Sequence, residues 1–182
     1  DFMLKEIHEQ PAAIAETLRG RTSPDGRLRL DEFHGLADED LRDVDKVFIV
    51  GCGTSYHAGL VAKYAIEHWA RLPVEIDIAS EFRYRDPVLD ARTLVVGISQ
   101  SGETLDTMEA CRFAKTAANK AKVLAIVNVV DSSMAREADA VLYTRAGPEI
   151  GVASTKCHLA QIVATDLLAL WLGQVRGLLV PD

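Results

Sequence analysis

The chain has 182 residues, of which 48% are hydrophobic, and carries a net charge of −7. This length allows one compact domain with a real core, and the acidic balance argues against a nucleic-acid partner. The three cysteines are far apart in sequence and form no C-x-x-C motif, a pattern typical of a reduced cytoplasmic protein.

The N-terminal part predicts a helical lead-in. Apolar residues recur at helical spacing over 2–19, and Pro11 divides this run into two helices. The sequence SPDG at 23–26 predicts a turn, and the alternating stretch at 27–33 fits a peripheral strand or an extended linker. Because position 1 is Asp rather than Met, we expect the chain to be a piece of a longer protein.

Five short apolar runs from residue 46 onward predict a parallel β-sheet. They are rich in β-branched residues and almost continuously apolar, as in strands buried on both faces. Helix-like segments alternate with them, which predicts an α/β, doubly wound (flavodoxin-like) fold with a five-stranded parallel sheet. We assign 1–43 to a helical lead-in or interdomain linker and 44–182 to the folded domain. The predicted strands are 46–50, 74–78, 93–98, 122–127 and 140–144, and the predicted helices are about 55–71, 79–84, 104–120, 132–138 and 155–172.

Two segments bear on membrane association. The N-terminus is charged where a signal peptide needs apolar residues. The most apolar helix-like segment, 159–172, is interrupted by Gln161 and Asp166 and is too short to cross a bilayer. We therefore expect a cytoplasmic protein without a membrane partner.

The two loops with the most polar chemistry follow the first and third predicted strands. In the strand order 2-1-3-4-5, these two strands flank the switch point where such sheets bind ligands. The first loop, GCGTSYH at 51–57, places Thr54 and Ser55 at a helix start. Either hydroxyl fits a helix N-cap or one wall of a phosphate cradle.

The second loop, SQSGET at 99–104, favours the cradle. Ser99, Ser101 and Thr104 offer three hydroxyls to one anion, and Gln100 adds an amide donor. A single helix cap needs only one such residue. Glu103 would repel a phosphate, so we expect it to have a capping or helix-dipole role.

The sequences of the two loops also limit the class of phosphate ligand that the site can bind. Neither contains the lysine of a triphosphate-binding P-loop. Tyr56 stands where a dinucleotide fingerprint needs its third glycine, and a bulky ring there would push the helix away from the sheet. A compact monophosphate held from two sides therefore fits better than either alternative.

A third loop, GPEIGVASTK at 147–156, follows the fifth predicted strand. Backbone groups near Val152 are placed to meet ligand hydroxyls, while Ser154 fits a ligand contact and an N-cap equally well. Lys156 fits either a charge-balancing residue or a solvated first-turn residue. Cys52, at the mouth of the same cleft, is expected to pack rather than react, and we expect no metal or cofactor.

These motifs resemble those of a known family. GCGTSYHAG, ASEFRYRDP, SQSGETLDT and EIGVASTK, in this order, closely resemble the first sugar-isomerase (SIS) domain of the glucosamine-6-phosphate synthase family, the glutamine:fructose-6-phosphate aminotransferases. The opening FMLKEIHEQP resembles the helical lead-in of the same enzymes. The resemblance implies a hexose-phosphate pocket, with phosphate contacts from Thr54, Ser99, Gln100, Ser101 and Thr104, with Ser55 at the same cleft, and with sugar contacts at Val152 and Ser154.

The resemblance also implies what the chain lacks. In the family, the glutaminase nucleophile precedes this region, and the Schiff-base lysine, the proton-moving glutamate and the ring-opening histidine follow it. We therefore assign no catalytic residue and expect the chain to bind fructose 6-phosphate, glucose 6-phosphate or glucosamine 6-phosphate without converting it. Expected partners are the glutaminase and second SIS domains of the same protein and a second copy in a homodimer. The alternatives are a freestanding sugar-phosphate sensor and a nicotinamide-dependent oxidoreductase.

Overall fold

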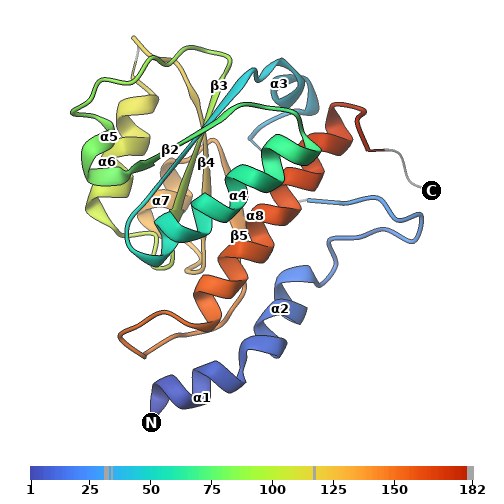
Figure 1. The fold of residues 1–182 in the computed structure, drawn as a ribbon, viewed down its shortest axis with the longest axis vertical. Helices are drawn as coiled ribbons and strands as arrows, with labels where there is room; N and C mark the ends of the chain where they lie inside the picture. The colour runs from blue at the N-terminus through green and yellow to red at the C-terminus, as the bar shows by residue number, and fades with distance from the viewer. Residues whose placement is uncertain (31–32, 34, 117, 180–182) are drawn as a thin grey trace.

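A five-stranded parallel sheet forms the centre of the computed structural model, which describes residues 1–30, 33, 35–116 and 118–179. The strand order is β2-β1-β3-β4-β5, so the predicted doubly wound topology is confirmed (Figure 1). The apolar runs form the strands because both faces of the sheet are covered. The strands are β1 (Lys46–Gly51), β2 (Val74–Ile78), β3 (Thr93–Ser99), β4 (Lys122–Val127) and β5 (Ala140–Tyr143).

Helices cover the sheet on two sides, with α4 and α8 on one face and α5, α6 and α7 on the other (Figure 1). Alternate strand residues enter the two cores: Val47 and Ile49 of β1 pack on the α4–α8 side, and Phe48 and Val50 on the other. The helices are α1 (Phe2–His8), α2 (Gln10–Leu18), α3 (Asp38–Asp43), α4 (Thr54–Trp69), α5 (Ala79–Phe82), α6 (Leu105–Ala114), α7 (Ser133–Glu137) and α8 (Lys156–Val175).

Three helices differ from the predicted pattern. Helix α3, a short helix with three acidic residues in its first turn, was not predicted. The predicted helix 104–120 was too long: α6 ends at Ala114, where the Asn119 side chain donates a hydrogen bond to the Phe113 carbonyl. Helix α8 is longer than predicted. The alternating stretch at 27–33 provides an isolated bridge from Leu28 to Thr22, and its residues 31–32 lie outside the described residues.

Helix α8 has 20 residues and contains an 18-residue window with a mean hydropathy of 1.2, so by length and composition it could cross a membrane. The prediction that this segment is too short was therefore wrong. In the fold, 56% of that stretch is buried, and Ala164, Leu168 and Leu172 belong to the core that also contains α4. Packing in the domain interior accounts for its apolar composition.

The lead-in contributes to this core. Thr17 of α2 donates a hydrogen bond to the Thr144 carbonyl (2.6 Å), and Leu30, Leu36 and Leu41 are buried in the α4–α8 core. The proposed boundary between residues 43 and 44 remains a prediction. What the structure shows is that residues before it complete the hydrophobic interior.

Candidate functional site

The carboxyl ends of β1 and β3 lie next to each other in the sheet. Gly51 at the end of β1 is in register with Ile98 of β3, so the loops that follow both strands begin at the same edge. Helices α4 and α6 start directly after these loops. Two helix N-termini with their free N–H groups therefore converge where the sequence predicted an anion.

The loop after β3 is held in a tight turn by its own hydroxyls. Ser99 Oγ accepts a hydrogen bond from Gly102 N–H (3.0 Å) and shares another with Thr104 Oγ1 (2.9 Å). Ser101 Oγ accepts from Glu103 N–H (3.1 Å) and keeps its own proton to donate. Gly102 has a φ of 68°, and a Cβ there would lie 2.1 Å from Ser132 Oγ, so this turn requires glycine. The fold thus brings Ser99, Ser101 and Thr104 together.

The loop after β1 contributes Thr54 and Ser55 in different ways. Gly53 is the N-cap of α4, and no side chain caps this helix end, so the N-cap interpretation of either hydroxyl was wrong. Thr54 is exposed. Ser55 is buried and accepts a hydrogen bond from Gln161 Nε2 of α8 (3.0 Å). Ser55 therefore joins α4 to α8, while Thr54 faces solvent.

Gln100 connects the β3 loop with the loop after β4. Its carbonyl accepts a hydrogen bond from Asn128 N–H (3.0 Å), and its side chain lies near enough to Cys157 to influence the pKa of that thiol. Burial raises the pKa of Cys157 to about 12, the neighbouring Glu149 carboxylate acts in the same direction, and the Gln100 contact opposes both. The thiol therefore stays protonated at neutral pH.

The loop after β5 is organised around Glu149. This carboxylate accepts hydrogen bonds from Ser154 Oγ (2.8 Å), Thr155 N–H (2.8 Å) and Cys157 N–H (3.2 Å). Burial opposes its ionisation, but these hydrogen bonds outweigh burial and lower the pKa of Glu149. Glu149, and not Ser154, thus caps α8. Val152 is fully exposed at the tip of the loop.

The structure also settles the roles of three neighbouring residues. Glu103 accepts a hydrogen bond from Ser133 N–H (2.8 Å) at the start of α7, which confirms a capping role. Lys156 is 5% exposed and its Nζ lies 2.7 Å from Glu9 Oε2, so the solvated interpretation was wrong. Cys52 packs against the core on the α6 side, as expected.

Sequence reasoning missed Asn128, which organises the neighbouring loop. Its Oδ1 accepts hydrogen bonds from Thr144 Oγ1 (2.9 Å) and Ala146 N–H (2.8 Å), and its Nδ2 donates to the Gly147 carbonyl (2.7 Å). A signal for it exists, because a polar residue directly follows an apolar strand at the ligand edge of the sheet. Gln161 and Glu149 carry no such signal, because their partners are distant or depend on the loop conformation.

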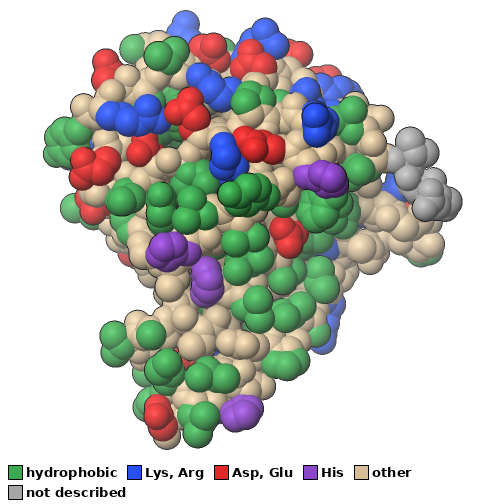
Figure 2. Space-filling model, viewed as in Figure 1, with side chains coloured by type: hydrophobic (Ala, Val, Ile, Leu, Met, Phe, Trp, Pro, Cys, Tyr) green, Lys and Arg blue, Asp and Glu red, His purple; other side chains and the backbone are tan. Residues whose placement is uncertain are grey.

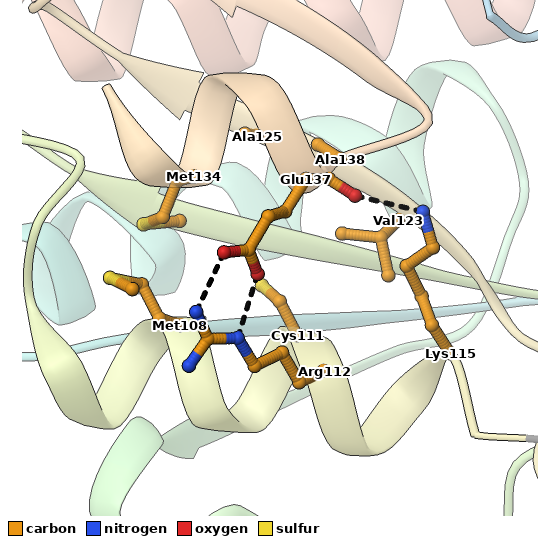
Figure 3. A pocket seen from close by; sticks show the side chains of 9 residues that line it. All are labelled: Met108, Cys111, Arg112, Lys115, Val123, Ala125, Met134, Glu137 and Ala138. Atoms are coloured by element: carbon orange, nitrogen blue, oxygen red, sulfur yellow. Dashed lines mark hydrogen bonds and ion pairs between the residues drawn. The ribbon is translucent and has the colours of Figure 1, made fainter.

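A cavity elsewhere in the fold is not this site. It measures about 30 Å³, lies between α6, α7 and β4, and is lined by none of the predicted site residues (Figure 3). Arg112 closes its rim through paired hydrogen bonds to the Glu137 carboxylate (2.6 and 2.7 Å). This volume holds about one water molecule, so the cavity does not fit a sugar. Within the described ranges, no cluster of His, Cys, Asp and Glu is arranged to hold a metal ion.

The comparisons with known proteins agree with this fold and these loops. The family model described as "SIS domain" matches residues 40–171. The chain is 68% identical over 181 residues to a glutamine–fructose-6-phosphate aminotransferase [isomerizing] of Mycolicibacterium paratuberculosis and 62% identical over 176 residues to that of Streptomyces coelicolor. These matches cover 100% and 97% of this chain, but 28% of the length of each relative.

A solved structure shows the same relation. The C-terminal domain of glucosamine-fructose-6-phosphate aminotransferase from Francisella tularensis is 43% identical and superimposes with a TM-score of 0.91. That match covers 99% of this chain and 49% of the other chain. The similarity thus extends over the lead-in as well as the sheet.

Proposed function

Because the chain belongs to the SIS-domain family, we propose that it is the sugar-phosphate-binding module of a glutamine–fructose-6-phosphate aminotransferase. In this proposal the module binds the hexose phosphate in the conversion of fructose 6-phosphate and glutamine-derived ammonia to glucosamine 6-phosphate. The relatives' names and the high identity support the assignment. The observation that carries it is the convergence of two hydroxyl-rich loops and two helix N-termini at the ends of β1 and β3.

The phosphate would bind between these two loops. Thr54, Ser101 and Thr104 offer hydroxyl protons, Gln100 is an additional donor, and the N-termini of α4 and α6 favour an anion. The sugar would extend toward the loop after β5, where Val152 and Ser154 are the proposed contacts. Ser55 and Ser99 would support the loops without contacting the ligand, since their hydroxyl groups are hydrogen-bonded to Gln161 and to the backbone of the β3 loop.

Binding without turnover is the second part of the proposal. Hydroxyl and amide groups hold a phosphate but do not move a proton between sugar carbons at neutral pH. The nearby carboxylates Glu103 and Glu149 are engaged in helix capping. We expect the chain alone to form no glucosamine 6-phosphate, the remaining groups being supplied by the glutaminase and second SIS domains.

Calorimetric titration with glucose 6-phosphate tests the pocket. A Ser101→Ala, Thr104→Ala variant should lose about tenfold or more in affinity, since two hydroxyl contacts are removed. Thr116→Ala serves as the matched control, because this exposed threonine lies beyond the opposite end of α6. Equal heats from the wild type and the double variant would exclude the pocket, and product formation by the chain would exclude the non-catalytic role.

We further propose a cytoplasmic homodimer. The three free cysteines fit a reducing compartment. Apolar side chains are exposed on α4, where Leu60, Val61 and Tyr64 are 38%, 44% and 75% accessible, and hydrophobic surface gathers over α4 and α8 (Figure 2). Light scattering over a concentration series should give twice the chain mass, and a concentration-independent monomer would exclude the dimer.

A further inference from the structure

The first helix of the lead-in reaches the loop that carries Val152 and Ser154. Helix α1 and the segment before α8 lie side by side at the end of the molecule (Figure 1). Glu6 of α1 is 3% exposed although it carries a carboxylate. A buried carboxylate is unfavourable unless it is hydrogen-bonded, so its partners indicate its purpose.

The partners of Glu6 are backbone groups of the loop. Glu6 Oε1 accepts hydrogen bonds from Ile150 N–H (2.6 Å) and Gly151 N–H (3.2 Å), and Oε2 accepts from Gly151 N–H (3.0 Å). Consecutive amides that meet one carboxylate fix both the position and the orientation of that backbone. They lie directly before Val152.

The contact between Glu6 and the loop leaves no room for a side chain at position 151. A Cβ at this position would lie 2.5 Å from Glu6 Oε2 and 3.4 Å from Met3 Cα. The first distance is shorter than any ordinary contact, so a side chain would displace the carboxylate or the loop. The absence of a side chain at 151 thus allows α1 and the loop to approach each other.

A second contact anchors the other end of the loop. Glu9 lies at the junction of α1 and α2, and its Oε2 is 2.7 Å from Nζ of the buried Lys156. The hydrogen bonds from Lys156 and Lys5 lower the pKa of Glu9 to about 2. Glu6 and Glu9 therefore hold the segment 150–156 on both sides of Ser154.

From this geometry we propose that Glu6 is a positioning residue for hexose recognition. It fixes the backbone at 150–151 so that Val152 and Ser154 meet the sugar, while the phosphate loops remain independent of it. The inference rests on the proposed function, because it concerns the same pocket. Its consequence is that the lead-in helix determines affinity for the sugar part of the ligand and not for the phosphate.

The experiment compares two ligands on matched variants. Glucose 6-phosphate affinity is measured by calorimetry, and inorganic phosphate affinity by its displacement of glucose 6-phosphate. Glu6→Ala should weaken glucose 6-phosphate binding about tenfold, on the scale of one or two lost hydrogen bonds, and leave phosphate affinity within about twofold. Glu6→Gln keeps one acceptor oxygen and should recover most of the loss. Glu16→Gln is the control, since Glu16 of α2 is half-buried, pairs with Arg19 and has no contact with the loop at 150–151.

A second variant reaches the same contact from the loop. Gly151→Ala should produce the same selective loss of glucose 6-phosphate affinity. If Glu6→Ala does not fold, this variant alone tests whether the contact between Glu6 and the loop supports sugar binding. Unchanged glucose 6-phosphate affinity in folded Glu6 and Gly151 variants would overturn the inference. Equal weakening of both ligands would also overturn it, because Glu6 would then support the whole site. Failure of the wild type to bind glucose 6-phosphate, or of phosphate to displace it, would instead refute the proposed function.

Discussion

The hydroxyl side chains of the site divide into two groups by their partners. Ser55 and Ser99 are buried and hydrogen-bonded within the protein, so they shape the loops. Thr54 is exposed and Ser101 and Thr104 are half-buried, so they can reach a ligand. Residues of the same type at the same edge therefore have different effects when they are replaced.

Ser55→Ala and Thr54→Ala test this division. Removing the Ser55 hydroxyl leaves the buried Gln161 Nε2 without its acceptor, which costs about 1–3 kcal/mol of unfolding free energy. Thr54→Ala should change stability by less than about 0.5 kcal/mol and should instead weaken glucose 6-phosphate binding. Urea denaturation and calorimetry measure the two quantities. Equal stability of the two variants would contradict the assigned roles.

Because Glu149 caps α8 as a carboxylate, we expect the free energy of unfolding to depend on pH. Its pKa is lowered in the folded state, so its contribution is present above the ordinary pKa of 4.5 and is lost as the pH falls through the lower folded value. Glu149→Gln should cost about 0.5–2 kcal/mol at pH 7, as for other helix caps. The difference from the wild type should shrink on acidification toward pH 3.

Urea denaturation of both proteins at several pH values checks this prediction. Glu81→Gln is the control, because Glu81 is exposed on the short helix α5. A stability difference that persists unchanged from pH 7 to pH 3 would show that the Glu149 charge does not support α8.

At the scale of elements, the sheet and the edge that carries the site could be predicted because their signals are local. Continuous β-branched runs fix the strands, and parallel order places the polar loops after β1 and β3 together. The cap of α8 could not be predicted, since Glu149 reaches it through an irregular loop. The contact from Glu6 to Gly151 spans 145 positions, and no pattern in sequence connects them.

The close approach of α4 to the sheet also carries no clear signal in the sequence. Tyr56 stands where a dinucleotide fingerprint needs its third glycine, but the close contact between α4 and the sheet is made at Gly59, three residues later. A Cβ at Gly59 would lie 2.9 Å from Ile49 Cγ2. The helix therefore approaches the strand at a glycine that the fingerprint spacing does not identify.

Gly59→Ala sets two opposing effects against each other. Alanine improves helix propensity by up to about 1 kcal/mol, whereas overpacking against the β-branched Ile49 costs about 1–3 kcal/mol. Ile49 is buried in a central strand and has little room to move, so we expect net destabilisation. Val61→Ala, on the exposed side of α4, should change the unfolding free energy little. A gain in the melting temperature of Gly59→Ala would contradict this packing account.

For the whole molecule, the lead-in packs against the elements of the sheet domain. Ala13 of α2 packs with Cys157 and Ala160 of α8, and Thr17 bonds the end of β5. Together with the contacts of Glu6 and Glu9, these interactions connect both helices to the loop before α8. We therefore expect the lead-in to fold together with the domain that holds the candidate site.

Removal of residues 1–18 tests this role. The truncated chain would expose Ala160 and Cys157 and leave Lys156 without Glu9. We expect the melting temperature to fall by roughly 5–10 °C, as for a loss of a few kcal/mol in a chain of this size. Circular dichroism measures it, and an unchanged melting temperature would show that the lead-in is only appended to the domain.

We propose that the loops after β1 and β3 form a hexose 6-phosphate pocket. A crystal structure of the chain soaked with glucose 6-phosphate tests it most directly. We expect a phosphate within hydrogen-bonding distance of Ser101 and Thr104, about 2.5–3.2 Å, with the sugar directed toward Val152 and Ser154. Sugar-phosphate density at any other place, or none between these loops at saturating ligand, would contradict it.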